Sequence, residues 1–503
     1  MGDSGEFLRR DDRVAVKSSF QKEANVMEPG KNRGSSRRNF LKKTTAVGAA
    51  GVAGALGINA VAPIVIPEKM VFEKNRSFWA WVLPAANPAL TQDLVADVAI
   101  IGGGFTGLSA AYYLKKNRPG REVVLLEAEQ CGNGASGRNG AMMLTMTDDR
   151  FMEWSGEPEL DKRIYELTVD NIRRMTELSA ELGIDADIEQ NGAVQVCNTQ
   201  ALAEAGREYI EKMKSSGMPF EYWDRAKLVE TIGTNIYGGG LFDPSSGQLH
   251  PGKLVKLFKA AAESAGARVF EGTAVVDVEE GGEVRLTTGN GRTVRAKAVV
   301  LATNAYTSKL GYLRGGVTPI FNFVGITAPL SEAKLAQTGW KRRIPFNDSR
   351  TEVYYLGLTR DNRIHIGGGA AEYEFNNGLE EPKNGERHYE GLRTELARIY
   401  PALAGEAFET TWYGAVDMSL DRTPVVGQMG KHGNVYYAIG FSGHGVNLTS
   451  IFGRILADLV EGDGKSWRWL PYVNRLPIYT PNEPFRWVGV QLALGYYRLT
   501  EPK

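Results

Sequence analysis

The sequence predicts an α/β protein that combines a Rossmann-like unit with a second region of short strands and turns. Near residue 97, a short apolar strand leads at once into a glycine-rich turn, a helix and a second strand. Two later apolar strands, 298–302 and 434–439, also open into polar or glycine-rich turns. The segments 186–240 and 313–407 mix short strand patterns with turns, and no long linker sets them apart from the rest.

Composition excludes several classes of function. The 503 residues include 59 Lys+Arg and 59 Asp+Glu, so the formal net charge is zero and we expect no nucleic-acid partner. The two cysteines, Cys131 and Cys197, are too few for a disulfide framework or a four-thiolate zinc site. We therefore expect two unpaired thiols and no metal site.

The N-terminal region is typical of an export signal. Residues 1–35 are polar and are predicted to be disordered, because they offer little apolar surface for packing. The motif Ser36-Arg37-Arg38-Asn39-Phe40-Leu41-Lys42 then precedes an uncharged stretch over residues 44–67. The segment 36–67 resembles a bacterial twin-arginine signal, which implies export by the twin-arginine translocase to the periplasm. Either the signal is cleaved or the uncut stretch anchors the protein in the membrane.

The glycine-rich turn carries the pattern of a dinucleotide site. Gly102 permits the tight turn after the strand 97–101, Gly104 lets the backbone approach a pyrophosphate, and Gly107 lets the helix pack on the strand. Phe105 and Thr106 stand at the helix N-terminus, where free N–H groups attract phosphate. After the second strand, 121–126, Glu127 lies where a carboxylate can accept hydrogen bonds from a ribose diol. These residues alone fit either NAD or FAD.

The loop after Glu127 favours FAD. Its segment Gly134-Ala135-Ser136-Gly137-Arg138-Asn139-Gly140 resembles the corresponding loop of the D-amino-acid oxidase and glycine oxidase (DAO) family, and especially the gamma-glutamylputrescine oxidoreductase subgroup. In that family the loop runs beneath the pyrophosphate and reaches the flavin ring. The resemblance implies FAD contacts from Ala128, Ala135, Ser136, Arg138, Asn139, Gly140 and Ala141. Ala141 stands where many members have glycine.

The resemblance continues from about residue 95 to the C-terminus and implies further FAD contacts. Val275 matches a valine whose backbone touches adenine, or it is a plain strand residue. Ala302 and Thr303 match the third cofactor segment of the family. A turn that aims a helix N-terminus at the flavin pyrimidine is matched by Gly440, Gly443, His444 and Gly445. His444 is either a ring contact or a structural residue of this turn.

The same resemblance implies how the chain divides. An FAD-binding domain of the glutathione-reductase type is expected at 95–150, 245–312 and 408–470. A substrate domain with a mixed, largely antiparallel sheet is expected at 151–244 and 313–407. Residues 471–503 are then a C-terminal extension.

The reaction implied by the resemblance is oxidation of a C–N bond in an amine or amino acid. A hydride passes to flavin N5, and the imine product is hydrolysed. The electron acceptor is either O2 or a respiratory carrier. A non-catalytic flavoprotein subunit is an alternative from another class. A disulfide or NAD(P)H reductase is disfavoured because the sequence has neither a second G-x-G-x-x-G nor a C-x-x-C motif.

Three residues are candidates for catalytic roles. Tyr354 and Tyr355 lie on a predicted strand, so alternation turns one of them inward, and Tyr355 is our candidate. Arg422 either binds a substrate carboxylate or braces its loop. His365 lies on a predicted strand, on the face opposite Ile364 and Ile366. The resemblance places that strand over the flavin, where a protonated histidine would stabilise developing superoxide.

Overall fold

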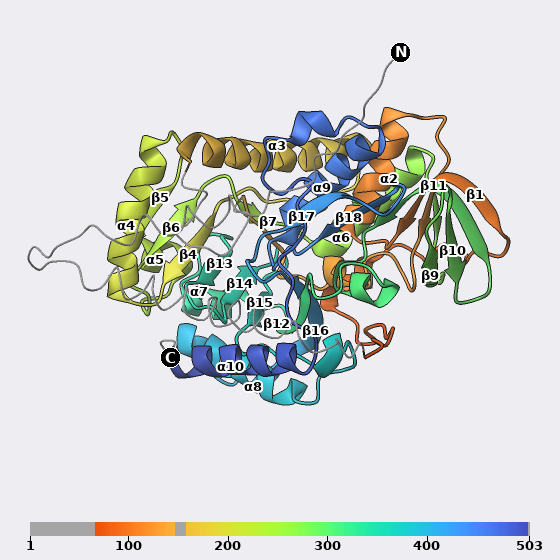
Figure 1. The fold of residues 1–503 in the computed structure, drawn as a ribbon. Coiled ribbons are helices and arrows are strands. Elements are labelled where there is room, and N and C mark those ends of the chain that lie inside the picture. Colours follow the sequence, from red (N-terminus) through yellow and green to blue (C-terminus); the bar gives the residue numbers. More distant parts are fainter. Residues whose placement is uncertain (1–65, 146–156, 501–503) are drawn as a thin grey trace, which may run out of the picture. The chain divides into compact units, whose positions relative to one another are not determined.

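The computed structural model describes residues 66–145 and 157–500 (Figure 1). All of these residues belong to one unit of the chain, Val61–Lys503. The segment 1–35 and nearly all of the signal segment 36–67 lie outside the described residues, so the predictions made for them stay predictions. In the described ranges, no helix has both the length and the hydropathy that crossing a bilayer requires.

The first sheet holds the Rossmann-like unit. Its strand order is β17 (Val425–Met429), β18 (Val435–Ile439), β11 (Thr293–Leu301), β1 (Leu94–Ile101), β2 (Val123–Leu126) and β8 (Arg268–Phe270). An antiparallel arm of β10 (Val284–Thr288) and β9 (Val275–Glu279) pairs with β11. The strands from β18 to β8 are parallel. The centre of this sheet is covered on both faces, which explains why β1 and β2 are nearly continuous apolar runs.

Four helices form the main core on the first sheet. They are α2 (Phe105–Asn117), α3 (Pro158–Leu182), α6 (Pro251–Ser264) and α9 (Gly445–Val460). Helices α2 and α9 pack so closely that a Cβ atom on Gly453 would lie 2.6 Å from the side chain of Ser109. Glycine at this position therefore permits the close contact. Helix α3 lies beside α9 (Figure 1). Its apolar stripe packs in the same core as α6 and α9.

The second sheet is mixed and largely antiparallel, as predicted. Its order is β16 (Phe408–Met418), β12 (Thr318–Thr327), β15 (Ile364–Gly368), β14 (Tyr354–Leu358), β13 (Phe346–Asp348), β4 (Ala193–Cys197), β6 (Gly239–Asp243) and β5 (Glu221–Asp224). Only β13 and β4 pair in parallel within this sheet. The helix α8 (Gly385–Ile399) packs on β12, β15 and β16.

The other elements connect the two sheets or surround them. A small ribbon joins β3 (Met142–Met143) to β7 (Gly247–Gln248). Among residues 66–145 and 157–500, the other α-helices are α4 (Gln200–Ser215), α5 (Arg225–Ile232), α7 (Glu332–Thr338) and α10 (Phe485–Thr500). Short 3-10 turns are η1 (Phe78–Val82), η2 (Ala135–Gly137), η3 (Asn304–Leu310), η4 (Phe375–Asn377), η5 (Pro401–Leu403) and η6 (Gly464–Trp467).

Two segments differ from the predicted division of the chain. The strand β16, assigned by sequence to the FAD-binding domain, pairs with β12 along nearly its whole length and so belongs to the second sheet. The helix α3, assigned to the substrate domain, packs in the first core because its apolar residues meet α6 and α9. In both cases contacts between segments far apart in sequence decide the placement.

Candidate active site

A cavity of about 520 Å³ extends from the end of β1 to the second sheet. Most of the predicted site residues line it: Gly102, Gly104, Phe105, Thr106, Glu127, Ala128, Ala135, Ser136, Arg138, Asn139, Gly140, Val275, Ala302, Thr303, Tyr355, Arg422, Gly443, His444 and Gly445. Four predicted residues are not part of the lining: Gly107, Ala141, His365 and Gly440. The structure therefore brings together positions that span more than 300 residues of sequence.

The turn after β1 needs glycine for conformation and for space. Gly102 has φ +106°, and a Cβ atom on it would lie 2.4 Å from the carbonyl oxygen of Ala302. A Cβ atom on Gly107 would lie 2.0 Å from the carbonyl oxygen of Gly102. Gly107 thus acts behind the cavity by letting α2 pack on the turn, which is the role that its position in the motif predicts.

The carboxylate of Glu127 is fixed at the end of β2. It accepts a hydrogen bond from the Gly103 backbone N–H at 2.6 Å and another from the Glu129 N–H at 3.0 Å. Burial raises the pKa of Glu127, while these two hydrogen bonds oppose the rise. Both N–H groups hold the side chain in one place against the cavity.

The N-terminus of α2 meets the loop that follows β2. The hydroxyl of Ser136 accepts a hydrogen bond from the Phe105 N–H at 2.8 Å, so the loop is joined to the first turn of the helix. A Cβ atom on Gly104 would lie 2.9 Å from this hydroxyl. Gly104 therefore leaves open the space beside the helix N-terminus, where an anionic group is favoured.

Arg138 anchors a segment of the protein. Its guanidinium forms an ion pair with Glu73 at 3.4 Å and donates to the carbonyl oxygens of Asn75 at 2.6 Å and Tyr413 at 3.0 Å. Its donors are thus used to hold residues 73–75 against β16. Arg138 also lines the cavity, and its contact with FAD stays a prediction.

The next residues of the loop are also fixed by internal contacts. The Asn139 amide donates to the carbonyl oxygen of Ser136 at 2.7 Å, and the Asn139 carbonyl oxygen accepts from the Trp79 indole at 2.8 Å. Ala141 has φ +60°, a backbone conformation that favours glycine. This conformation explains why glycine is common at the matching family position.

A second helix N-terminus reaches the cavity through the turn before α9. Gly440 has φ +79° and Ser442 has φ +50°. The Asp417 carboxylate accepts a hydrogen bond from the Gly440 N–H at 2.6 Å and so holds the turn. Gly440 acts behind the lining, whereas Gly443, His444 and Gly445 reach it.

Asp417 is a site residue that sequence reasoning missed. It lines the cavity at the end of β16 and is 2% exposed. Burial raises its pKa to about 7, because backbone hydrogen bonds only partly offset the loss of solvation. No motif marks this aspartate, since its partners come from a turn more than 20 residues later.

Comparison with known proteins identifies the family of this chain. The family model for DAO-type FAD-dependent oxidoreductases matches residues 97–459. The chain belongs to the DAO family of FAD-dependent oxidoreductases. A probable oxidoreductase OrdL from Haemophilus influenzae is 32% identical, over 75% of this chain and 85% of that protein. The gamma-glutamylputrescine oxidoreductase of Escherichia coli is 30% identical, over 82% of this chain and 94% of that protein.

Solved structures agree on the fold of this DAO-family enzyme. The crystal structure of glycine oxidase from Geobacillus kaustophilus superposes with a TM-score of 0.64 and 22% identity, covering 76% of this chain and 99% of that one. An L-proline dehydrogenase from P. horikoshii gives a TM-score of 0.61, with 21% identity and coverage of 74% and 94%.

The cavity fits FAD, the cofactor of the DAO family. One end offers an open glycine turn, a helix N-terminus and the fixed carboxylate of Glu127, which suit a pyrophosphate and a ribose diol. The cavity then continues along the loop 132–142 to the turn before α9. A nucleotide alone would not use this second end, whereas a flavin ring extends beyond the pyrophosphate.

Tyr355 is the inward residue of the pair on β14. Its ring lies between two glycines, because Cβ atoms on Gly140 and Gly367 would each lie 2.3 Å from the ring. Tyr354 instead packs with the guanidinium of Arg350 at 4.3 Å. Burial raises the pKa of Tyr355, so its hydroxyl is neutral at ordinary pH. Tyr355 therefore supplies a rigid neutral surface to the cavity.

Arg422 reaches the cavity from the loop after β16. Its backbone has φ +57°, and its N–H donates to the Ser419 carbonyl oxygen at 3.1 Å. The neighbouring Asp421 pairs with Arg475, which fixes the base of the loop. The position is compatible with either of the predicted roles, carboxylate binding or bracing.

His365 lies apart from the cavity, which differs from the prediction. Its side chain does face away from Ile364 and Ile366, but its ring packs edge-on against Trp79 with 5.5 Å between ring centroids. It is 1% exposed, and burial lowers its pKa to about 3. Burial thus favours the neutral imidazole over the cation that the predicted role requires. No motif in the sequence marks the contact of Trp79, in η1, with this face.

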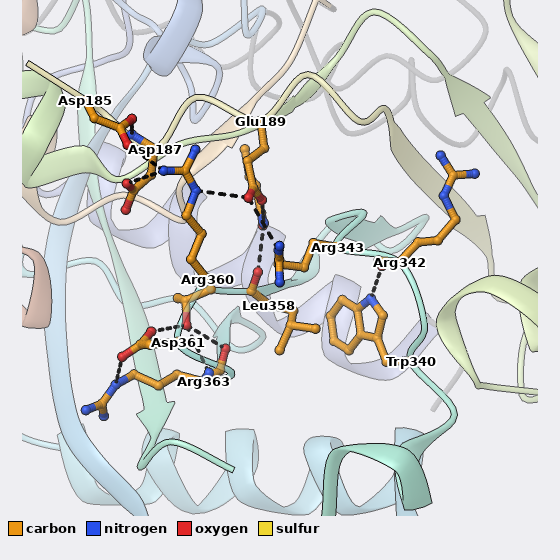
Figure 2. Close-up of polar contacts among 12 residues, drawn as sticks. Asp185, Asp187, Glu189, Trp340, Arg342, Arg343, Leu358, Arg360, Asp361 and Arg363 are labelled. Atoms are coloured by element: carbon orange, nitrogen blue, oxygen red, sulfur yellow. Dashed lines mark hydrogen bonds and ion pairs between the residues drawn. The ribbon is translucent and has the colours of Figure 1, made fainter. Parts of the chain in front are cut away.

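A charged cluster fixes the turn between β14 and β15 (Figure 2). Arg360 pairs with Asp185 at 2.7 Å, with Asp187 at 2.8 Å and with Glu189 at 3.1 Å. Arg343 lies 3.4 Å from Glu189. The cluster therefore ties the hairpin that carries Tyr355 to the segment before β4.

Proposed function

We propose that this FAD-dependent oxidoreductase oxidises the C–N bond of an amine or amino acid to an imine. The observation that carries the proposal is a single cavity that joins the FAD-type turn and Glu127 to an inward tyrosine of the second sheet. Bound FAD supplies the acceptor of a hydride from the carbon beside nitrogen. The amine loses a proton in the same oxidation, and water then converts the imine to a carbonyl compound and a released amine or ammonia.

The relatives support this choice of bond. One is named a gamma-glutamylputrescine oxidoreductase, another a D-amino acid dehydrogenase from Methylobacterium radiotolerans and a third a glycine oxidase from Geobacillus kaustophilus. Amines and amino acids share a carbon that bears both nitrogen and hydrogen. The proposal therefore rests on the bond that these named substrates have in common.

The residues of this chain contribute position and electrostatics. Tyr355 offers a fixed neutral surface, which helps to orient a substrate and to keep water away. Arg422 offers a guanidinium that suits a carboxylate, if the substrate carries one. No side chain is assigned as a base, because a neutral amine loses its proton readily once the carbon is oxidised.

The test is an anaerobic screen of amines and amino acids that follows the flavin absorbance. At least one compound is expected to bleach the flavin and to yield one carbonyl product per flavin reduced. Glu127→Lys should lose FAD and give no signal, whereas Glu122→Lys, at an exposed position just before β2, should keep it. A fully loaded enzyme that no amine or amino acid reduces would refute the proposal and favour a non-catalytic flavoprotein subunit.

The electron acceptor is either O2 or a respiratory carrier. Mixing substrate-reduced enzyme with O2 and, separately, with a soluble quinone distinguishes the two. Rapid reoxidation by O2 with release of hydrogen peroxide would identify an oxidase. Reoxidation by quinone alone would identify a dehydrogenase that fits the proposed export.

A further inference from the structure

The C-terminal helix α10 forms one wall of the cavity. Val490, Ala493, Leu494 and Tyr497 line the cavity and follow the spacing i, i+3, i+4, i+7, so they form one helical stripe. The opposite face carries Val488 and Leu492, which are 46% and 70% exposed. The two faces can therefore be altered separately.

Contacts near both ends of the stripe tie α10 to the loops that flank β14 and β15. The guanidinium of Arg498 donates to the Ala371 carbonyl oxygen at 2.6 Å and lies 3.5 Å from the Glu352 carboxylate. The Gln491 amide donates to the Tyr373 carbonyl oxygen at 3.4 Å. Since Ala371 and Glu352 also line the cavity, these contacts hold the stripe at its substrate-domain side.

The chamber bounded by α10 is mainly apolar. The stripe carries no charge, and the cavity-lining residues of β12 include Ile320, Phe321 and Val324. The Glu352 carboxylate at the rim is already paired with Arg498 and accepts the Ala371 N–H at 3.0 Å. A charged substituent placed against this wall would lose solvation without gaining a free partner from the stripe.

This wall lies outside the part of the chain that defines the family. The family match ends at residue 459, whereas α10 begins at Phe485. The wall therefore lies outside residues 97–459, which the family model matches.

We propose that α10 is a substrate-selecting wall that favours amines or amino acids with an apolar or aromatic side group. The inference rests on the proposed C–N oxidation and adds the class of substrate. An apolar group gains by burial against the stripe, and each added CH2 should tighten binding roughly fourfold until the chamber is full. A second ammonium or carboxylate at the same position is disfavoured.

The test compares Ala493→Trp, which fills the chamber, with Leu492→Trp, which adds the same ring on the exposed face. Methylamine, butylamine, hexylamine and benzylamine are titrated into the oxidised holoenzymes, with 1,4-diaminobutane and 4-aminobutanoate as charged counterparts. The shift in flavin absorbance gives Kd without turnover, and anaerobic mixing gives the limiting rate of flavin reduction.

The wild type should bind hexylamine and benzylamine more tightly than either charged compound. Ala493→Trp should weaken the binding of hexylamine by at least about tenfold and that of methylamine by much less, and Leu492→Trp should match the wild type in Kd and in limiting rate. Tyr497→Ala removes volume from the same wall and should instead admit larger side groups. This variant replaces Ala493→Trp in the test if Ala493→Trp does not fold.

Three results would overturn the inference. They are equal effects of the two tryptophan variants, loss of FAD from an Ala493→Trp variant that is otherwise folded, and tighter binding of the charged compounds by the wild type. Absorbance shifts that follow the expected order without flavin reduction by any amine would instead contradict the proposed oxidation and leave the wall in place. No absorbance shift with any compound would contradict the wall itself.

Discussion

Tyr355 is held between two glycines, so its position depends on the absence of their side chains. A Cβ atom on Gly140 would lie 2.3 Å from the ring, and the ring also lies close to Gly367, where a Cβ atom would again be 2.3 Å away. Gly140→Ala should therefore displace the ring and destabilise the protein by about 1–3 kcal/mol. We expect weaker FAD retention as well, because Gly140 belongs to the cofactor loop.

The measurement is denaturant unfolding together with the flavin-to-protein absorbance ratio. Gly120→Ala is the control, since a Cβ atom there meets no atom within 4 Å. Equal stability and full FAD content in both variants would show that Tyr355 adapts freely.

Asp417 couples stability to pH through its buried carboxyl group. Its pKa is raised to about 7 from an ordinary value of 3.8, so the folded protein binds a proton that the unfolded chain has released. The contribution of Asp417 to the free energy of unfolding is therefore largest at low pH, and it is lost as the pH rises from about 4 to about 7. Asp417→Asn should remove that loss, because the amide oxygen can still accept from Gly440.

Thermal unfolding of the holoenzyme and of Asp417→Asn between pH 5 and 8 checks this prediction. The Tm of Asp417→Asn minus the Tm of the wild type should increase as the pH rises. A constant difference between the two proteins across this range would mean that the Asp417 carboxyl does not titrate there.

Site residues with a backbone role were predictable from sequence, whereas side-chain partners were not. The spacing of Gly102, Gly104 and Gly107 defines a turn geometry that any chain must meet, and the structure places them accordingly. The roles of Arg138 and His365 depend on residues 73–79, which are distant in sequence and carry no motif. Asp417 was missed for the same reason.

The β14–β15 hairpin positions Tyr355, and its turn is held by a cluster of opposite charges (Figure 2). Arg360 contacts three carboxylates, of which Asp187 and Glu189 are mostly buried. Arg360→Ala leaves these carboxylates close together without their shared cation. We expect a loss of about 1–2 kcal/mol, decreasing at high salt because surface pairs are screened.

Urea unfolding at low and high salt measures this loss. Arg342→Ala is the matched control, because Arg342 is exposed and its hydrogen bond to the Trp340 indole uses the backbone carbonyl oxygen. A loss no larger than that of the control would show that the cluster contributes nothing to the hairpin.

Elements with a clear apolar period were predictable, and those stabilised by distant partners were harder to recognise. The stripe from Ile164 to Leu182 predicted a helix, and α3 contains it. The residues of α10 are apolar on two faces, one toward the cavity and one exposed, so no single stripe marked the helix. The position of α10 became clear only from the structure, in which one of its apolar faces lines the cavity.

At the scale of the molecule, the chain passes repeatedly between the two sheets. The first sheet takes strands from near residue 94 to residue 439, and the second takes strands from 193 to 418. Local pattern identified the two kinds of sheet, but it could not assign β16, whose ten-residue pairing with β12 is non-local.

The export signal is a proposal that concerns the whole chain. The motif around Arg37 and Arg38 would direct a folded, FAD-loaded enzyme to the twin-arginine translocase. Replacing both arginines with lysine should leave the protein in the cytoplasm while its FAD content stays normal. Cell fractionation of the full-length chain measures this, and periplasmic recovery of the double variant would contradict the proposal.

In the proposed oxidation, a C–H bond beside nitrogen breaks as FAD is reduced. The most direct test is rapid anaerobic mixing of the holoenzyme with an accepted amine and with the same amine deuterated at the carbon beside nitrogen. We expect clearly slower flavin reduction with the deuterated compound and an unchanged Kd. Equal reduction rates, in a regime where substrate binding is fast, would show that this bond is not broken in the reductive step.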